Sequence, residues 1–79
     1  MRYPALQDRV RLTHAIPTLW LDRGDVGVVR SVWRSSPQYY EVEFRKPGEP
    51  CATRALVRRE DLEVVEAAAE VAPLAGARS

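Results

Sequence analysis

The chain has 79 residues, of which 46% are hydrophobic and 29% are charged, and its formal net charge is +1. This length suits one small domain, and no apolar run approaches the roughly 20 residues that span a membrane. One Cys and one His are too few for a zinc site, which usually has four ligands. We therefore expect no metal, no cofactor and no membrane partner.

Two further features of the composition indicate a compartment and a charge pattern. The first ten residues contain no apolar segment typical of a secretory signal, and the single Cys51 cannot form an internal disulfide. A cytoplasmic protein is the expectation. Residues 1–60 hold eleven of the twelve basic residues, and four of the eleven acidic ones lie in 61–79. The expected domain is thus mildly basic, and the end of the chain is mildly acidic.

The first expected strand is Asp8–Thr13, where Val10 and Leu12 alternate with polar residues. Residues 14–23 contain Pro17 and lack regular alternation, so we expect a loop there. Its apolar side chains should tuck against the domain, and Trp20 is interpreted as a lid over the core or as an exposed anchor for a partner.

The stretch 21–29, LDRGDVGVV, raises the question of what its two glycines do. A phosphate-binding loop requires a helix after the glycines, but Val28–Trp33 is rich in β-branched residues and favours a strand. We therefore predict a structural turn in which Gly24 takes a positive φ and Gly27 allows close backbone approach. The turn residues are Gly24, Asp25 and Gly27.

The next strand carries a spacing that a flat strand does not explain. Val29 and Val32 are three residues apart and would point to opposite faces. Either the strand is buried on both sides, or a bulge lies between the two valines.

The rest of the chain predicts three more strands and a tail. Tyr39–Arg45 alternates most clearly, with Tyr40, Val42 and Phe44 on one face. A turn at 46–50 precedes a strand at 51–57, a short 3₁₀ turn at 59–62 and a last strand at 62–65. An alanine-rich, flexible tail is expected at 67–79. The predicted fold is therefore an all-β small barrel at 1–66 with about five antiparallel strands.

The order of these motifs resembles the SH3-like small barrels. The run Gly24-x-x-Gly27-x-Val29, followed by Tyr40–Phe44, is similar to the glycine–glycine–valine run of the KOW element. The pieces at 10–13, 16–17, 21–29, 40–44 and 61–65 most resemble an uncharacterised bacterial family, domain of unknown function four-nine-two-six. The nitrile hydratase β-subunit barrel is a more distant likeness. The resemblance covers about residues 6–66 and implies a fold, but no catalytic residue; the prolines at 47 and 50 and the tail depart from the pattern.

No catalytic constellation is evident, so we expect a non-enzymatic module that binds another protein. The expected partner is the other member of a toxin–antitoxin or immunity pair, or a larger enzyme that the barrel accompanies. A closed barrel of this size should also lack a ligand-sized pocket, which is typically about 300 Å³ or more. Cys51 is expected to be a buried, inert thiol.

The alternative hypothesis is KOW-like binding of RNA or single-stranded nucleic acid, in which aromatic rings stack on bases and arginines contact phosphates. Both hypotheses use one candidate surface. Its residues are Trp20, Trp33, Arg34, Tyr39, Arg45 and Arg58.

Overall fold

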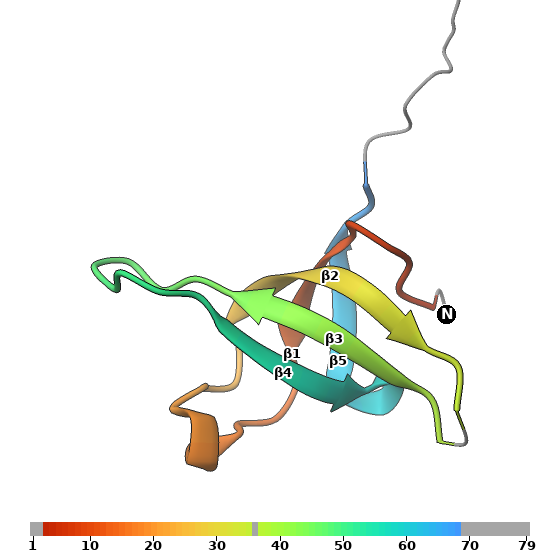
Figure 1. The fold of residues 1–79 in the computed structure, drawn as a ribbon, viewed down its shortest axis with the longest axis horizontal. Coiled ribbons are helices and arrows are strands. Elements are labelled where there is room, and N and C mark those ends of the chain that lie inside the picture. The colour runs from red at the N-terminus through yellow and green to blue at the C-terminus, as the bar shows by residue number, and fades with distance from the viewer. Residues whose placement is uncertain (1–2, 36, 69–79) are drawn as a thin grey trace, which may run out of the picture.

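A computed structural model shows an all-β fold, and it describes residues 3–35 and 37–68. The five strands are β1 (Arg9–Leu12), β2 (Val26–Trp33), β3 (Tyr39–Phe44), β4 (Thr53–Arg58) and β5 (Leu62–Glu66). They form one antiparallel sheet in the order β4-β3-β2-β1-β5 (Figure 1). Among the described residues β4 and β5 are the two edges of this sheet, so the curled sheet does not close into a barrel.

Two 3₁₀ turns connect the strands. One spans Arg59–Asp61 and joins β4 to β5, as the sequence predicts. The other spans Pro17–Leu19, within the segment that the sequence indicates only as a loop. The expected tail at 67–79 lies, from residue 69 onward, outside the described residues.

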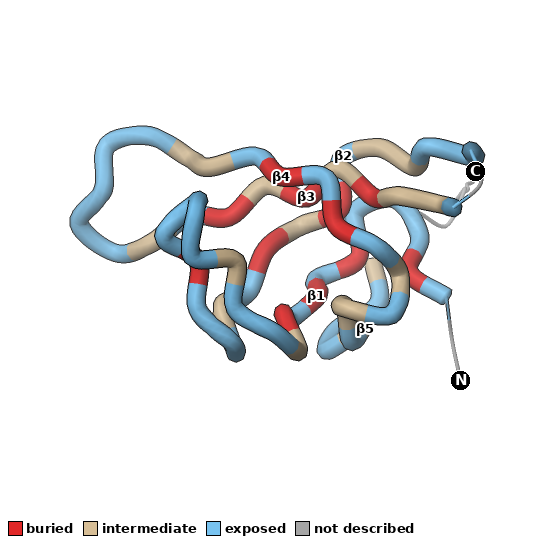
Figure 2. The backbone as a smooth tube through the Cα atoms, turned by 90° about the horizontal axis from the view of Figure 1, so that it is seen from below, coloured by how far each residue is buried: buried red, intermediate tan, exposed pale blue. Residues whose placement is uncertain are grey.

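The core lies between the β2–β3–β4 part of the sheet and the β1–β5 part, where the buried residues gather (Figure 2). The alternation in the sequence is confirmed, because the side chains predicted to point inward in β1 and β3 are 2% exposed or less. Those side chains are Val10, Leu12, Tyr40, Val42 and Phe44.

The spacing of Val29 and Val32 reflects a bulge rather than a strand buried on both faces. Val29 lies opposite Val42, and Ser31 lies opposite Glu41, which leaves Arg30 as the extra residue. A bulge bends its strand and increases the local twist. The bulge lies just beyond the residues of β2 that pair with β1, and the Arg30 side chain is exposed to solvent.

The glycine turn forms as the sequence predicts. Gly24 has a φ of +94°, and its N–H donates to the Leu12 carbonyl at 2.9 Å. The Asp25 carboxylate accepts the backbone N–H of Asp22 at 2.9 Å and closes the turn. A Cβ on Gly27 would lie 2.7 Å from the Glu43 carbonyl oxygen, so this position admits only glycine where β2 crosses β3.

Asp8 connects the segment before β1 to the segment after β5 through hydrogen bonds. Its carboxylate is almost fully buried and accepts the N–H of Ala5 at 2.9 Å and that of Ala68 at 2.8 Å. Residues 3–7, here called the N-terminal arm, are thereby held beside the end of β5 (Figure 1). The arm positions one wall of a groove that is described below.

Candidate functional site

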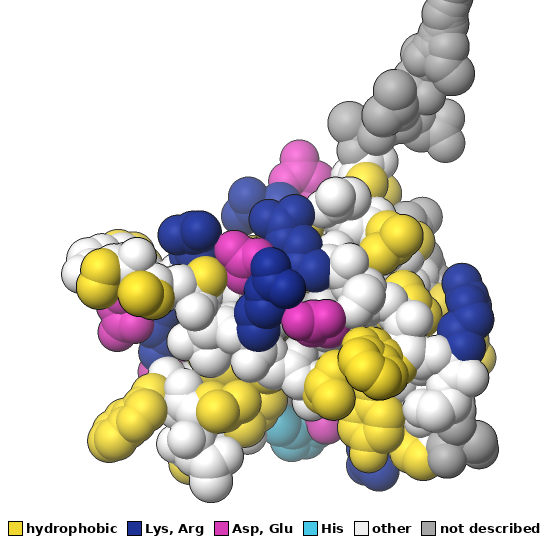
Figure 3. All heavy atoms as spheres, viewed as in Figure 1, with side chains coloured by type: hydrophobic (Ala, Val, Ile, Leu, Met, Phe, Trp, Pro, Cys, Tyr) yellow, Lys and Arg dark blue, Asp and Glu magenta, His cyan; other side chains and the backbone are white. Residues whose placement is uncertain are grey.

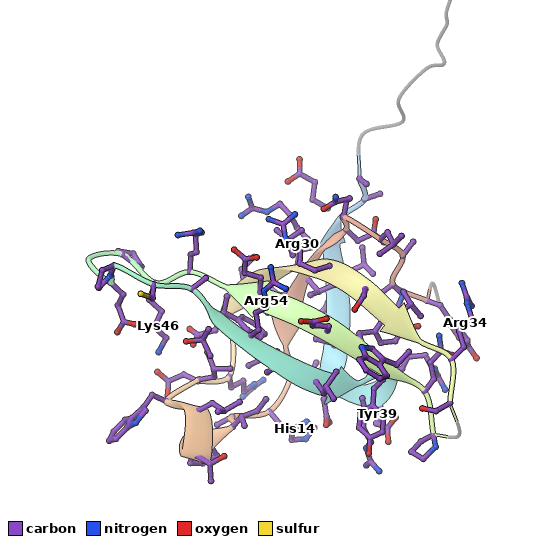
Figure 4. All side chains as sticks on the ribbon, in the orientation of Figure 1. His14, Arg30, Arg34, Tyr39, Lys46 and Arg54 are labelled. Carbon is purple, nitrogen blue, oxygen red and sulfur yellow. The ribbon has the colours of Figure 1, made fainter. Side chains whose placement is uncertain are left out.

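The outer face of β2, β3 and β4 brings together three of the six candidate residues. Trp33 lies opposite Tyr39, and Tyr39 lies opposite Arg58, so the three form one row across the strands. The row lies at the end of the sheet where the β2–β3 loop begins, and Tyr39 is visible there in Figure 4. The three side chains share this face because side chains alternate along a strand, and the residues before and after each of the three point into the core or belong to a loop.

An apolar surface surrounds this row. Trp33 is 53% exposed and Leu56, on β4, is 54% exposed. Both line a shallow hollow of about 210 Å³, together with Ala55, Glu41 and Arg54. We call Trp33, Tyr39 and Leu56 the Trp33 face; hydrophobic side chains gather over this end of the strands in Figure 3.

Glu41 lies beside Trp33 in this hollow. Its carboxylate accepts a hydrogen bond from the Ser31 hydroxyl at 2.7 Å and one from Arg54 at 3.3 Å. These bonds, and a further one from the Trp33 side chain, lower the pKa of Glu41, with the Ser31 bond contributing most.

Beyond the Trp33 face, the same side of the sheet is an ionic network centred on Glu43. Arg30 lies 3.2 Å from its carboxylate, and Arg45 and Arg54 each lie 3.4 Å from it. The side chain of Glu43 is only 10% exposed. The Arg30 hydrogen bond is the main reason that the pKa of Glu43 is lowered, followed by attraction from Arg30, Arg54 and Arg45. Arg30 and Arg54 flank this region in Figure 4.

The other three candidate residues do not join the Trp33 face. Arg45 belongs to the ionic network, at the opposite end of β3. Arg34 follows β2 and lines the groove described below. Trp20 lies on the loop between β1 and β2, and its side chain is 85% exposed. The six residues therefore do not form one patch.

The interpretation of Trp20 as a core lid is wrong. Ile16 and Leu21 exchange backbone hydrogen bonds at 2.8 and 3.2 Å, which makes the residues between them a protruding tip. Trp20 ends the 3₁₀ turn with a φ of +57°. The reversal buries Leu21 and half-buries Ile16, but it directs Trp20 to solvent. Cys51 is likewise exposed rather than buried, because it lies before β4 in the turn region.

A groove runs between the N-terminal arm and the β2–β3 loop. Its volume is about 950 Å³, so the expectation that the domain lacks a ligand-sized hollow is wrong. The sheet is open at this end, and the arm forms the missing wall. Its lining includes Tyr3, Leu6, Val32, Arg34, Gln38 and Tyr40.

Several residues of these two surfaces are absent from the candidate set. The sequence does not indicate Leu56, because the facing of its strand is ambiguous, and it indicates Tyr40 only as a core residue. Tyr3 and Arg59 stack, with the guanidinium carbon 4.2 Å from the ring centre. The sequence contains no signal that Tyr3 and Arg59, which are 56 positions apart, are in contact.

The described part of the chain contains no cluster of three or more potential metal-ligating side chains, and no helix there is long and apolar enough to cross a membrane. His14, the one histidine, is exposed and lies 3.2 Å from Asp61; Figure 4 shows it on the side of the molecule away from Arg30.

Comparison with known proteins yields no match to a family model, a curated protein or a solved structure.

Proposed function

We propose that the chain is a non-enzymatic module that binds another protein through the Trp33 face. The observation that carries this proposal is an exposed indole and an exposed leucine that line one hollow on the outer face of the sheet. Large apolar side chains of this kind dominate the binding energy of protein interfaces, and Trp is the most enriched.

The surrounding charges indicate the chemistry of the partner. Arg58 borders the face in the same row, and Arg54 borders the hollow. Both arginines are already paired with Glu side chains, so the face is an apolar centre with a neutralised ionic rim. A protein surface that presents an apolar side chain among uncharged polar groups would be complementary to this arrangement.

Nucleic acid is the less favoured partner because most of the positive charge is already neutralised. Of the ten described arginines and lysines, seven form ion pairs with Asp or Glu. Binding of a nucleic acid requires several cations that are free to meet phosphates.

We further propose that the chain belongs with the SH3-like small barrels, a likeness that five antiparallel strands and the 3₁₀ turn before β5 support.

The proposal is tested by selecting a displayed random-peptide library on the purified protein. We expect the enriched peptides to share an aromatic or aliphatic residue. Trp33→Ala should weaken their binding by about tenfold or more, since it removes an interface anchor.

Trp20→Ala is the matched control, because it deletes an even more exposed Trp at a different site and should leave the affinity unchanged. Equal losses in both variants would contradict the proposal. Preferential, salt-sensitive binding of a mixed-sequence single-stranded oligonucleotide would support the nucleic-acid alternative instead.

A further inference from the structure

The groove beside the N-terminal arm contains a hydroxyl group that the fold buries without a protein partner. Tyr40 is 1% exposed and lines the groove. Among the described residues no side chain or backbone group hydrogen-bonds its hydroxyl. Burying a hydroxyl without a partner costs free energy, so its placement at the wall of a groove suggests a ligand.

Two arginines near this hydroxyl also lack an acidic partner. Neither Arg34 nor Arg59 forms an ion pair with any carboxylate in the described ranges, unlike the arginines of the outer face. Arg34 lines the groove, and Arg59 stacks on the ring of Tyr3, which also lines it. The positive charges of both arginines act on the Tyr40 hydroxyl. Figure 4 shows Arg34 at the end of the molecule where the β2–β3 loop lies.

Arg59 is held in an orientation that suits an oxyanion. Its guanidinium stacks on the Tyr3 ring at 4.2 Å, and stacking leaves the N–H groups in the guanidinium plane free. Such a fork matches the two oxygens of a carboxylate. Tyr40 can supply a further donor, because a phenol is protonated near neutral pH and burial raises the pKa of this one further.

The rest of the groove is apolar. Pro4, Leu6 and Val32 line it next to the polar end, and Leu6 is 54% exposed. A chain with an acidic group beside an aliphatic one would fill both parts. A nucleic acid fits less well, because among the described residues only two cations without an ion pair lie beside the groove, and Arg30, at its edge, already contacts Glu43 and Gln7.

We propose that this groove binds a peptide carboxylate, with Arg34 and Arg59 as its counter-charges, the Tyr40 hydroxyl as a neutral donor and the apolar wall holding the adjacent aliphatic side chain. The inference concerns a surface separate from the Trp33 face and does not rest on it.

The test is a titration of the ¹⁵N-labelled full chain, followed by NMR, with three small probes. These are acetyl-Leu-Glu-amide, its neutral analogue acetyl-Leu-Gln-amide, and acetyl-Gln-Leu with a free chain-end carboxylate. We expect saturable shifts at Arg34, Gln38 and Tyr40, with the Gln analogue about tenfold weaker than the better acidic probe, because a charge-assisted hydrogen bond is lost. The two acidic probes tell whether a side chain or a chain end is preferred.

Two variants separate binding from folding. Arg34→Gln should weaken the better acidic probe about tenfold. Tyr40→Phe should weaken it about fivefold while leaving the thermal midpoint the same or higher, because a hydroxyl without a partner is removed. A hydroxyl with a structural role would lower the midpoint. Arg11→Gln removes an exposed arginine of β1 that lines neither surface, and this variant should bind as the unmodified protein does.

Several results would overturn the inference. They are equal affinity for the Glu and Gln probes, full affinity in Arg34→Gln, or shifts spread over the surface instead of the groove. Tighter, saturable binding of a single-stranded oligonucleotide at the same amides would also overturn it and assign the groove to nucleic acid.

Discussion

At the scale of single residues, the two glycines of the β1–β2 turn have different physical reasons to be glycine. A Cβ on Gly27 would lie 2.7 Å from the Glu43 carbonyl oxygen and 2.8 Å from the Phe44 ring. Gly24 has open space around it but a φ of +94°. One position is restricted by neighbouring atoms, and the other by its own backbone.

We therefore predict that Gly27→Ala lowers the free energy of unfolding by about 2–3 kcal/mol, because the clash involves backbone that cannot move aside. Gly24→Ala should cost only about 1–2 kcal/mol of backbone strain. Urea unfolding of both variants measures the difference.

Asparagine separates the two causes, since it tolerates positive φ better than alanine does. Gly24→Asn should recover part of the loss seen in Gly24→Ala, whereas Gly27→Asn should be worse than Gly27→Ala. Recovery at Gly27 would show that crowding is not the cause there.

At the scale of the elements, Glu43 links β2, β3 and β4 through its arginine partners. The pKa of Glu43 lies below its ordinary value of 4.5, mainly because Arg30 hydrogen-bonds the ionised form. A lowered folded pKa means that the contact contributes stability above the unfolded pKa, and that this contribution is lost as the pH falls through the folded pKa.

Glu43→Gln should therefore lower the urea midpoint at neutral pH and reduce the further loss on acidification to about pH 3. Urea midpoints of both proteins across this range provide the measurement. Glu49→Gln, in the exposed turn before β4, is the control and should leave the slope unchanged. A Glu43→Gln protein with the same acid sensitivity as the unmodified chain would contradict this role.

The strands could be predicted from the sequence because each has a buried and an exposed face, and alternation records that difference. Tyr39–Phe44 is the clearest case. The loop 14–23 could not be predicted in the same way, since the burial of Leu21 and the exposure of Trp20 depend on a left-handed residue after a 3₁₀ turn. Hydrophobicity alone treats both residues as core.

At the scale of the whole molecule, the candidate surface of the sequence analysis separates into distinct regions. Trp33, Tyr39 and Arg58 could be grouped only once the strand register was known. The groove could not be predicted, because it arises between the N-terminal arm and the β2–β3 loop, where no local pattern records the contact. Its polar end depends on the packing of Arg59 against Tyr3.

The open sheet also makes Asp8 important for the molecule as a whole. β5 pairs with β1 alone in the described structure, and the Asp8–Ala68 hydrogen bond is the connection just beyond its end. β3, in contrast, pairs on both sides. Local stability should therefore fall from β3 toward β5.

Asp8→Ala should lower the free energy of unfolding by about 2–3 kcal/mol, because it removes the charged acceptor of two partly buried backbone N–H groups. Native-state hydrogen exchange should show the largest increase in rate in β5 and the N-terminal arm, and a smaller one in β3. Asp22→Ala removes an exposed carboxylate and should change neither region. If the exchange rate in Asp8→Ala rose equally in β3 and β5, Asp8 would stabilise the whole sheet uniformly. This result would contradict a local stabilising role of Asp8 at the β5 edge.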